Sequence, residues 1–128
     1  MFVKSLRDCP ALIANDGCRV FELLHEKNDP VDLPYSMAVA EVACGERSYR
    51  HRLEQAEVYY VLSGQGLMHI DEATRAVGEG DAVLIPAGAV QWIENTGAGT
   101  LQFLALVSPP WTADGDERLE SENLSSSD

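Results

Sequence analysis

The sequence predicts an all-β fold, either a sandwich or a barrel. Many short runs of aliphatic, β-branched and aromatic residues follow one another at nearly regular spacing. Glycine and proline separate these runs, and no stretch repeats its apolar residues with the period of an α-helix. Short strands divided by such turns are typical of antiparallel sandwiches and barrels.

The apolar runs and the turn residues between them give the expected elements. The strands span residues 2–6, 18–24, 35–44, 49–53, 57–62, 67–71, 74–77, 82–85, 91–95 and 100–107. Residues 11–14 fit either a short strand or a turn of helix. Turn-forming residues mark 15–17, 63–66, 78–81, 86–88 and 96–99, and residues 25–34 form a polar loop with two prolines.

The expected strand over residues 35–44 carries small side chains on one face, which are those of Ser36, Ala38, Ala40 and Val42. Small side chains leave space in front of the sheet. The pattern therefore indicates either the wall of a pocket or a closely packed sandwich layer.

Length and charge limit the classes of function. A chain of 128 residues can form one domain with its own hydrophobic core. The formal net charge of -12 argues against nucleic acid and anionic membranes as partners, because both are bound by basic surfaces. No apolar run is long enough for a signal sequence or a membrane span.

Three scattered cysteines, Cys9, Cys18 and Cys44, lack the CxxC spacing of a metal or redox motif. We therefore expect reduced thiols and a cytoplasmic protein. Cys44 stands at the end of an expected strand and is either a reactive thiol or a buried structural cysteine.

The chain is expected to form one domain with three parts. Residues 1–34 supply strands and a loop that pack on the barrel, and residues 35–111 form its core. Residues 112–128 are an acidic, flexible tail, in which 117–124 can form a helical turn or two.

Two blocks of spaced residues resemble a known family. The first contains Gly45, His51, Glu57 and Gly64, and the second contains Gly80, Pro86, Gly88 and Asn95. This spacing resembles that of the paired motifs of the cupin superfamily, and in particular its small single-domain members. The resemblance implies a single-domain jelly-roll β-barrel that pairs as a homodimer through its sheets.

The resemblance also implies a metal site, but a depleted one. Metal-binding cupins use three histidines and a glutamate to hold a divalent first-row metal. His51 and Glu57 stand at two of these positions, whereas Leu53 and Gln91 replace histidines. Leu53 cannot bind a metal, and Gln91 offers only a neutral carbonyl oxygen. The expected ligands of Fe, Mn, Ni or Zn are thus His51, Glu57 and Gln91. The alternative is a metal-free pocket in which His51 and Glu57 form a hydrogen-bonded acid–base pair.

Two tyrosines lie two positions away from these acid–base residues and share their faces. Tyr49 and Tyr59, together with Leu53 and Gln91, are expected either to line a ligand pocket or to fill the core or an interface.

Three other side chains are expected to lie outside the pocket. His69 should point away from it, because the resemblance implies apolar core residues at the positions of its neighbours Met68 and Ile70, and adjacent side chains of a strand point to opposite faces. Trp92 should point away from the side of Gln91. His25 precedes a polar loop and is expected at the surface or at an interface, with the mouth of the barrel as the alternative.

Three functions are compatible with these features. The first is a small-molecule-binding cupin with a depleted metal site. The second is a metal-dependent enzyme of isomerase, epimerase or dioxygenase type that acts on a small polar metabolite. The third is a non-catalytic accessory or structural dimer. A fold alone does not choose among them.

Overall fold

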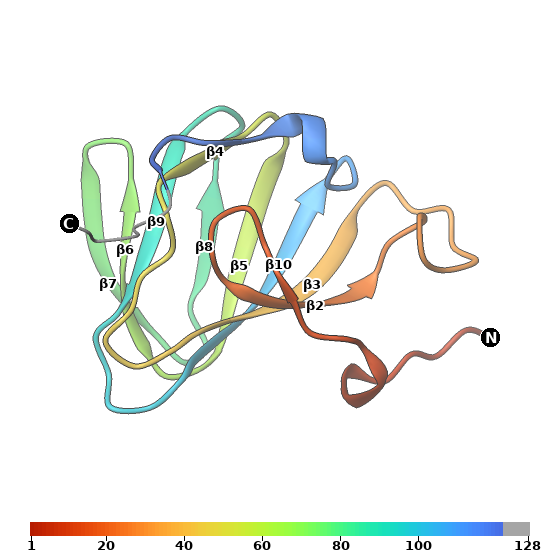
Figure 1. The fold of residues 1–128 in the computed structure, drawn as a ribbon, viewed down its shortest axis with the longest axis horizontal. Coiled ribbons are helices and arrows are strands. Elements are labelled where there is room, and N and C mark those ends of the chain that lie inside the picture. The colour runs from red at the N-terminus through yellow and green to blue at the C-terminus, as the bar shows by residue number, and fades with distance from the viewer. Residues whose placement is uncertain (122–128) are drawn as a thin grey trace.

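Two antiparallel sheets face each other in the structure, a computed structural model that describes residues 1–121 (Figure 1). The six-stranded sheet has the order β1 (Leu12–Ile13), β2 (Arg19–Leu24), β3 (Ser36–Val42), β10 (Leu101–Ser108), β5 (Ala56–Ser63) and β8 (Ala82–Ile85). The five-stranded sheet has the order β11 (Asp116–Arg118), β4 (His51–Leu53), β9 (Val90–Asn95), β6 (Gln65–Ile70) and β7 (Ala73–Gly78). Two short 3-10 helices complete the fold, η1 (Leu6–Asp8) and η2 (Ala113–Gly115).

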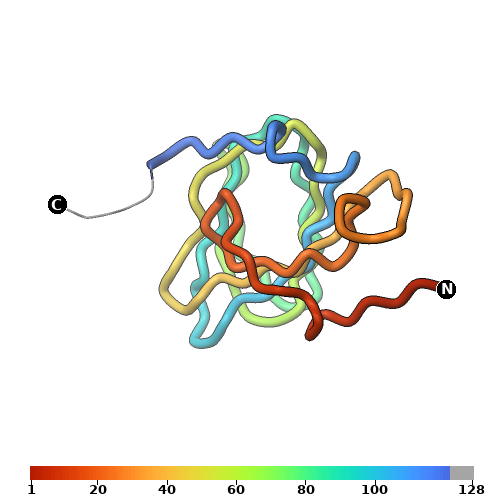
Figure 2. The backbone as a smooth tube through the Cα atoms, turned by 45° about the vertical axis from the view of Figure 1, so that its right-hand side comes forward, coloured from red at the N-terminus to blue at the C-terminus, as the bar shows by residue number. Residues whose placement is uncertain are grey.

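Most strands pair with neighbours that are distant in the sequence, and the two sheets wrap around a common axis (Figure 2). β10, for example, lies between β3 and β5 and is antiparallel to both. This arrangement is a jelly-roll barrel, as the sequence predicted. The strands were also predicted close to their observed positions, with residues 2–6 and β11 as the exceptions.

The core lies between the sheets because alternate side chains of each strand point inward. Along β10, Leu101, Phe103, Ala105 and Val107 are buried in this way. The ring of Phe103 packs on that of Tyr59 from β5, with 4.2 Å between ring centroids. Burying one such large side chain contributes about 1.5–3 kcal/mol to the free energy of unfolding.

Residues 2–6 do not form the predicted strand. Phe2 and Val3 are exposed, and the first element is η1. The apolar residues of this segment therefore find no sheet partner, and propensity alone does not make a strand.

The predicted hairpin loop over residues 63–66 is shorter than expected, because β5 ends at Ser63 and β6 begins at Gln65. Gly64 has a φ of 93°, and a Cβ at this position would lie 2.8 Å from the backbone oxygen of Thr100. Both constraints require glycine, so this one residue makes the reversal.

The start of the predicted flexible tail is ordered. Its residues 113–118 form η2 and β11, and β11 is antiparallel to β4. Glu117 is therefore in a strand and not in the expected helical turn. The remainder of that helix prediction falls partly on residues 122–124, outside the part of the chain that the structure describes.

Apolar side chains are exposed on the outer face of the six-stranded sheet. Tyr60 and Leu62 alternate with buried residues on β5, and Leu84 of the edge strand β8 lies opposite Val58 on the same face. Leu84 is 69% exposed. Within residues 1–121, no helix is long and apolar enough to cross a membrane.

Candidate functional site

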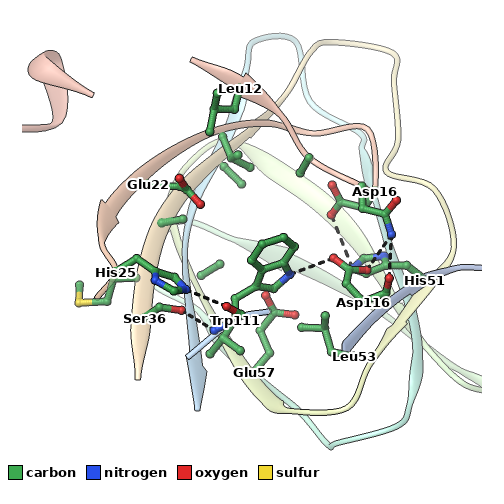
Figure 3. A pocket seen from close by; sticks show the side chains of 18 of the residues that line it. Leu12, Asp16, Glu22, His25, Ser36, His51, Leu53, Glu57, Trp111 and Asp116 are labelled. Carbon is green, nitrogen blue, oxygen red and sulfur yellow. Dashed lines mark hydrogen bonds and ion pairs between the residues drawn. The ribbon is translucent and has the colours of Figure 1, made fainter. Parts of the chain in front are cut away.

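A cavity of about 230 Å³ lies between the sheets. One wall is the inner face of β3, where Ser36, Ala38 and Ala40 line the space. Of the two interpretations of these small side chains, the structure supports the wall of a pocket, although Val42 at the end of the row does not line it. Aromatic and aliphatic side chains form most of the remaining wall, among them Tyr59, Phe103, Val107 and Trp111. The polar side chains that reach the cavity include His51, Glu57, Asp16 and Asp116, which Figure 3 shows from close by.

A chain of hydrogen bonds joins the buried polar groups of β5 and β9. The Tyr59 hydroxyl donates to Gln91 Oε1 over 3.0 Å, and Gln91 Nε2 donates to Glu57 Oε1, also over 3.0 Å. Gln91 is only 1% exposed, so its amide group lies behind the cavity wall and not in the open space. Both of its polar ends are used by neighbouring side chains.

Glu57 is a carboxyl group kept mainly uncharged at neutral pH. Burial raises its pKa to about 8, and the charges of Asp16 and Asp116 add to this effect, while the bond from Gln91 opposes it. Because Glu57 Oε1 accepts the hydrogen of Gln91, the carboxyl proton belongs on Oε2. Glu57 can therefore donate a hydrogen bond, or a proton, to a bound molecule.

His51 is oriented by the backbone and faces a different carboxylate from the one expected. Its Nδ1 lies 3.0 Å from the carbonyl oxygen of Tyr49, which can only accept, so Nδ1 carries a hydrogen. Its Nε2 lies 3.6 Å from Asp16 Oδ2. Asp16 is itself held by the backbone N–H of Cys18, which donates to Oδ1 over 3.0 Å.

The expected hydrogen-bonded pair of His51 and Glu57 is therefore not formed. Each residue lines the cavity, but His51 is partnered by Tyr49 and Asp16, whereas Glu57 is partnered by Gln91. The acid and the imidazole are separate groups on the wall of one space.

Three residues outside the two matched motif blocks complete the site: Asp16, Trp111 and Asp116. Trp111, after β10, is held at its backbone N–H by Ser36 Oγ and at its indole N–H by Asp116 Oδ2, each over 3.0 Å. Figure 3 shows its indole between His25 on one side and Asp116 on the other. Sequence reasoning missed these residues because Asp16 resembled part of a turn and Asp116 part of a tail. The large aromatic Trp111, which follows Pro109 and Pro110 after the last core strand, was the one available signal.

His25 does not lie at the surface, as preferred, but at the cavity, which agrees with the alternative of the barrel mouth. His25 is 8% exposed and lines the cavity. Its Nε2 donates to the Trp111 carbonyl oxygen over 2.7 Å, and its Nδ1 accepts from the Lys27 N–H over 3.0 Å. Since both ring nitrogens are occupied, His25 holds Trp111 in place.

Other singled-out residues lie away from the cavity. The ring of Tyr49 packs against Gly17 and under the Arg118 guanidinium, so this tyrosine does not line the cavity, whereas Leu53 and Tyr59 do. His69 pairs with Glu94 and stacks on Trp92, away from the cavity as expected. Cys44 is exposed and not the buried cysteine that was one of its two interpretations.

The donors at the expected metal position do not fit a first-row metal. Gln91 turns its NH2 group, which cannot bind a metal, toward Glu57 and its oxygen toward Tyr59. Leu53 supplies no donor. Within residues 1–121, no three His, Cys, Asp or Glu side chains are grouped so that they could hold a metal ion. The site therefore offers one imidazole and one protonated carboxyl group, whereas a first-row metal requires several ligating imidazole, thiolate or carboxylate groups.

The family model described as "Cupin domain" matches residues 38–107, and the chain belongs to this family. An uncharacterised protein of Methanocaldococcus jannaschii is 36% identical over 109 residues, which cover 84% of this chain and 86% of the relative. An oxalate-binding protein of Thermotoga maritima is 37% identical over 51 residues, or 40% of this chain and 42% of the relative.

Solved structures with the same fold include enzymes of different kinds. The polyketide cyclase RemF from Streptomyces resistomycificus has a TM-score of 0.78 at 21% identity and covers 96% of this chain and 88% of its own. A predicted oxalate decarboxylase from Thermotoga maritima has a TM-score of 0.72 at 22% identity, with 84% and 99% covered. At these identities the likeness concerns the fold alone.

Proposed function

We propose that this cupin binds a small uncharged organic molecule in its cavity and does so without a metal ion. The observation that carries the proposal is the hydrogen-bonded chain from Tyr59 through Gln91 to Glu57. In this chain Gln91 stands where the second cupin motif has a histidine. The hydrogen bonds leave Glu57 as a protonated donor at the wall of an otherwise largely apolar space.

The size of the cavity favours a compact ligand. Its volume of about 230 Å³ is below the roughly 300–1,000 Å³ of pockets that hold drug-sized molecules. The rings of Tyr59, Phe103 and Trp111 line it, so a molecule with one ring or a short carbon skeleton suits the wall.

The charges around the cavity favour an uncharged ligand. Asp16 and Asp116 line it together with Glu57, and their negative charges already oppose ionisation of Glu57. An entering anion would meet the same repulsion. A dianion such as oxalate, which the name of the Thermotoga maritima relative gives as that protein's ligand, is therefore a poor ligand for this chain.

Elemental analysis of protein purified without chelators or an affinity tag tests the metal part of the proposal. We expect no stoichiometric metal, either in the natural sequence or in a Glu57→Ala control. Near-stoichiometric iron, manganese, nickel or zinc that falls away in Glu57→Ala would contradict it.

A thermal-shift screen of chelator-treated protein tests the ligand part. Small uncharged ketones, lactones and phenols are compared with carboxylates of the same size. We expect stabilisation by uncharged compounds only, and its loss in Ala38→Leu, which fills space beside β3. The matched control is His69→Gln, which alters a histidine outside the cavity and should bind as the natural sequence does.

We also propose that two chains pair through the outer face of the six-stranded sheet. Tyr60 and Leu62 of β5 and Leu84 of the edge strand β8 are exposed there. A second copy related by a two-fold axis would cover this surface with the same surface of its own.

A further inference from the structure

We propose that the cavity catalyses proton transfer at the carbon atom next to the carbonyl group of a small uncharged ketone or aldehyde, with His51 Nε2 as the base and the Glu57 carboxyl as the acid. This inference rests on the function proposed above and adds a reaction to it.

The orientation of His51 makes Nε2 the basic atom. Since Nδ1 donates its hydrogen to the Tyr49 carbonyl oxygen, the uncharged imidazole has its lone pair on Nε2. The 3.6 Å from Nε2 to Asp16 Oδ2 is too long for a hydrogen bond, so this lone pair is not used there. The same distance is short enough for the Asp16 charge to stabilise the imidazolium ion that forms when Nε2 takes up a proton.

A second histidine–carboxylate pair, His69 with Glu94, serves as a comparison, because both ring nitrogens of this structural histidine have partners. His69 engages Glu94 through Nε2 and the Thr74 hydroxyl through Nδ1, and its ring stacks on Trp92. Both nitrogens are occupied, and the residue lies away from the cavity. His51, in contrast, has one nitrogen fixed by the backbone and the other on the cavity wall.

Glu57 supplies the complementary acid. Its Oε1 is occupied by Gln91, so Oε2 holds the proton and is the atom that can meet a carbonyl oxygen. Glu57 comes from β5 and His51 from β4, which belong to opposite sheets. The acid and the base therefore reach the ligand from two sides of one space, as the two ends of a C–C=O unit require.

The step is balanced without an oxidant or a metal. The C–H bond next to the carbonyl breaks and its proton moves to His51 Nε2. The electron pair forms a C=C bond, and the carbonyl oxygen takes the Glu57 proton, which gives an enol. In the reverse step Glu57 takes back the enol hydroxyl proton while the His51 imidazolium protonates the same carbon, and exchange of the imidazolium proton with solvent labels that carbon. With a hydroxyketone the intermediate is an enediol. Glu57 then takes the proton of the other hydroxyl, whose oxygen becomes the new carbonyl oxygen, while His51 protonates the former carbonyl carbon, and the compound is isomerised.

Exchange of carbon-bound hydrogen for deuterium, followed by proton NMR in D2O, tests the reaction. The probes are cyclohexanone and hydroxyacetone, with the chelator-treated full chain. We expect exchange above the buffer rate, reduced roughly 100-fold or more in His51→Gln and in Glu57→Gln. His69→Gln should keep the full rate. Saturation-transfer NMR on the same samples reports binding separately.

The outcomes separate this inference from the proposed function. Binding of either probe without exchange overturns the reaction and leaves the binding function standing. Absence of binding by both probes counts against both. Exchange that is absent from the chelator-treated chain and appears when metal is added also overturns both.

The tautomer of His51 gives a test that needs no substrate. Nitrogen-15 NMR of the uncharged imidazole should show hydrogen on Nδ1 and a lone pair on Nε2. The opposite tautomer would remove the base from the cavity and overturn the proposal.

Discussion

Gln91 lies directly across from His51 in the pairing of β9 with β4, yet its side chain bonds to Glu57 and Tyr59 of the opposite sheet. One amide group thereby joins the two layers of the barrel. Its donor and acceptor ends match the two partners, because the carboxyl Oε1 accepts and the phenol hydroxyl donates.

Replacing the amide of Gln91 should therefore destabilise the fold. Gln91→Leu leaves the Glu57 carboxyl and the Tyr59 hydroxyl buried without this partner, and we expect a loss of about 2–4 kcal/mol in the free energy of unfolding. Tyr59→Phe removes only one donor and should cost about 1 kcal/mol. Urea unfolding at pH 6 measures both. A cost below about 0.5 kcal/mol for Gln91→Leu would show that the bridge does not stabilise the protein.

The strands were predictable because the signals that specify them are local. Alternation along β3 and β10, and glycine at Gly64, are visible in the sequence without knowledge of the fold. The partners of the site residues were not predictable in this way. Asp16 and Asp116 come from a turn before β2 and from β11, and only the pairing of β11 with β4 brings Asp116 to the cavity. His25 carried no local signal of burial, because its burial depends on Trp111 far along the chain.

The stability of the protein should fall as the pH rises through the range of Glu57. Its pKa is raised to about 8 in the folded state, whereas the unfolded chain has an ordinary carboxyl near 4.5. Between these two pH values the folded state therefore holds one more proton than the unfolded state. The contribution of Glu57 to the free energy of unfolding is greatest below about pH 4.5 and falls as the pH rises to about 8. The full effect is on the order of 3–5 kcal/mol.

Glu57→Gln removes this dependence. In urea unfolding experiments, the free energy of unfolding of the variant should rise relative to that of the natural sequence as the pH increases from 5 to 8.5. Glu94→Gln, outside the cavity, is the control for a general change in charge. Parallel stability profiles for the natural sequence and Glu57→Gln would mean that Glu57 is charged in the folded protein.

The proposed homodimer can be tested at its apolar surface. Light scattering after size exclusion should give twice the mass of one chain. Leu84→Glu places a charge on the exposed face of β8 and should shift the population to single chains. Glu72→Lys changes charge on an exposed turn elsewhere and should leave the dimer intact. A natural chain that runs as a monomer at high concentration would refute the dimer.

Ordering of the segment after β10 should depend on Gly115. A Cβ at this position would lie 2.8 Å from Gln55 Oε1 and 2.9 Å from Thr112 Oγ1. Gly115→Ala should therefore loosen η2 and β11, which we expect to appear as faster amide hydrogen exchange in residues 113–118 and weaker ligand binding. Gly99→Ala is the matched control, because a Cβ there meets no atom within 4 Å. Equal exchange in the two variants would show that the segment tolerates the extra atom.

Restoring two histidines should convert the cavity into a metal site. Leu53 lies two residues after His51 on β4, both are buried on the inner side, and Gln91 is the direct neighbour of His51 on β9. In the double variant Leu53→His with Gln91→His, three imidazoles converge and Glu57 loses its Gln91 partner, so metal binding can compete with its protonation. We expect near-stoichiometric nickel or zinc by elemental analysis and a metal-dependent rise in melting temperature. The control, Arg52→His with Gln91→His, puts one imidazole on the exposed side of β4 and should bind neither metal there. Equal metal content in the two double variants would mean that the inner face of β4 and β9 does not form the metal position, and that more than the two replaced histidines separates this chain from the metal-binding cupins.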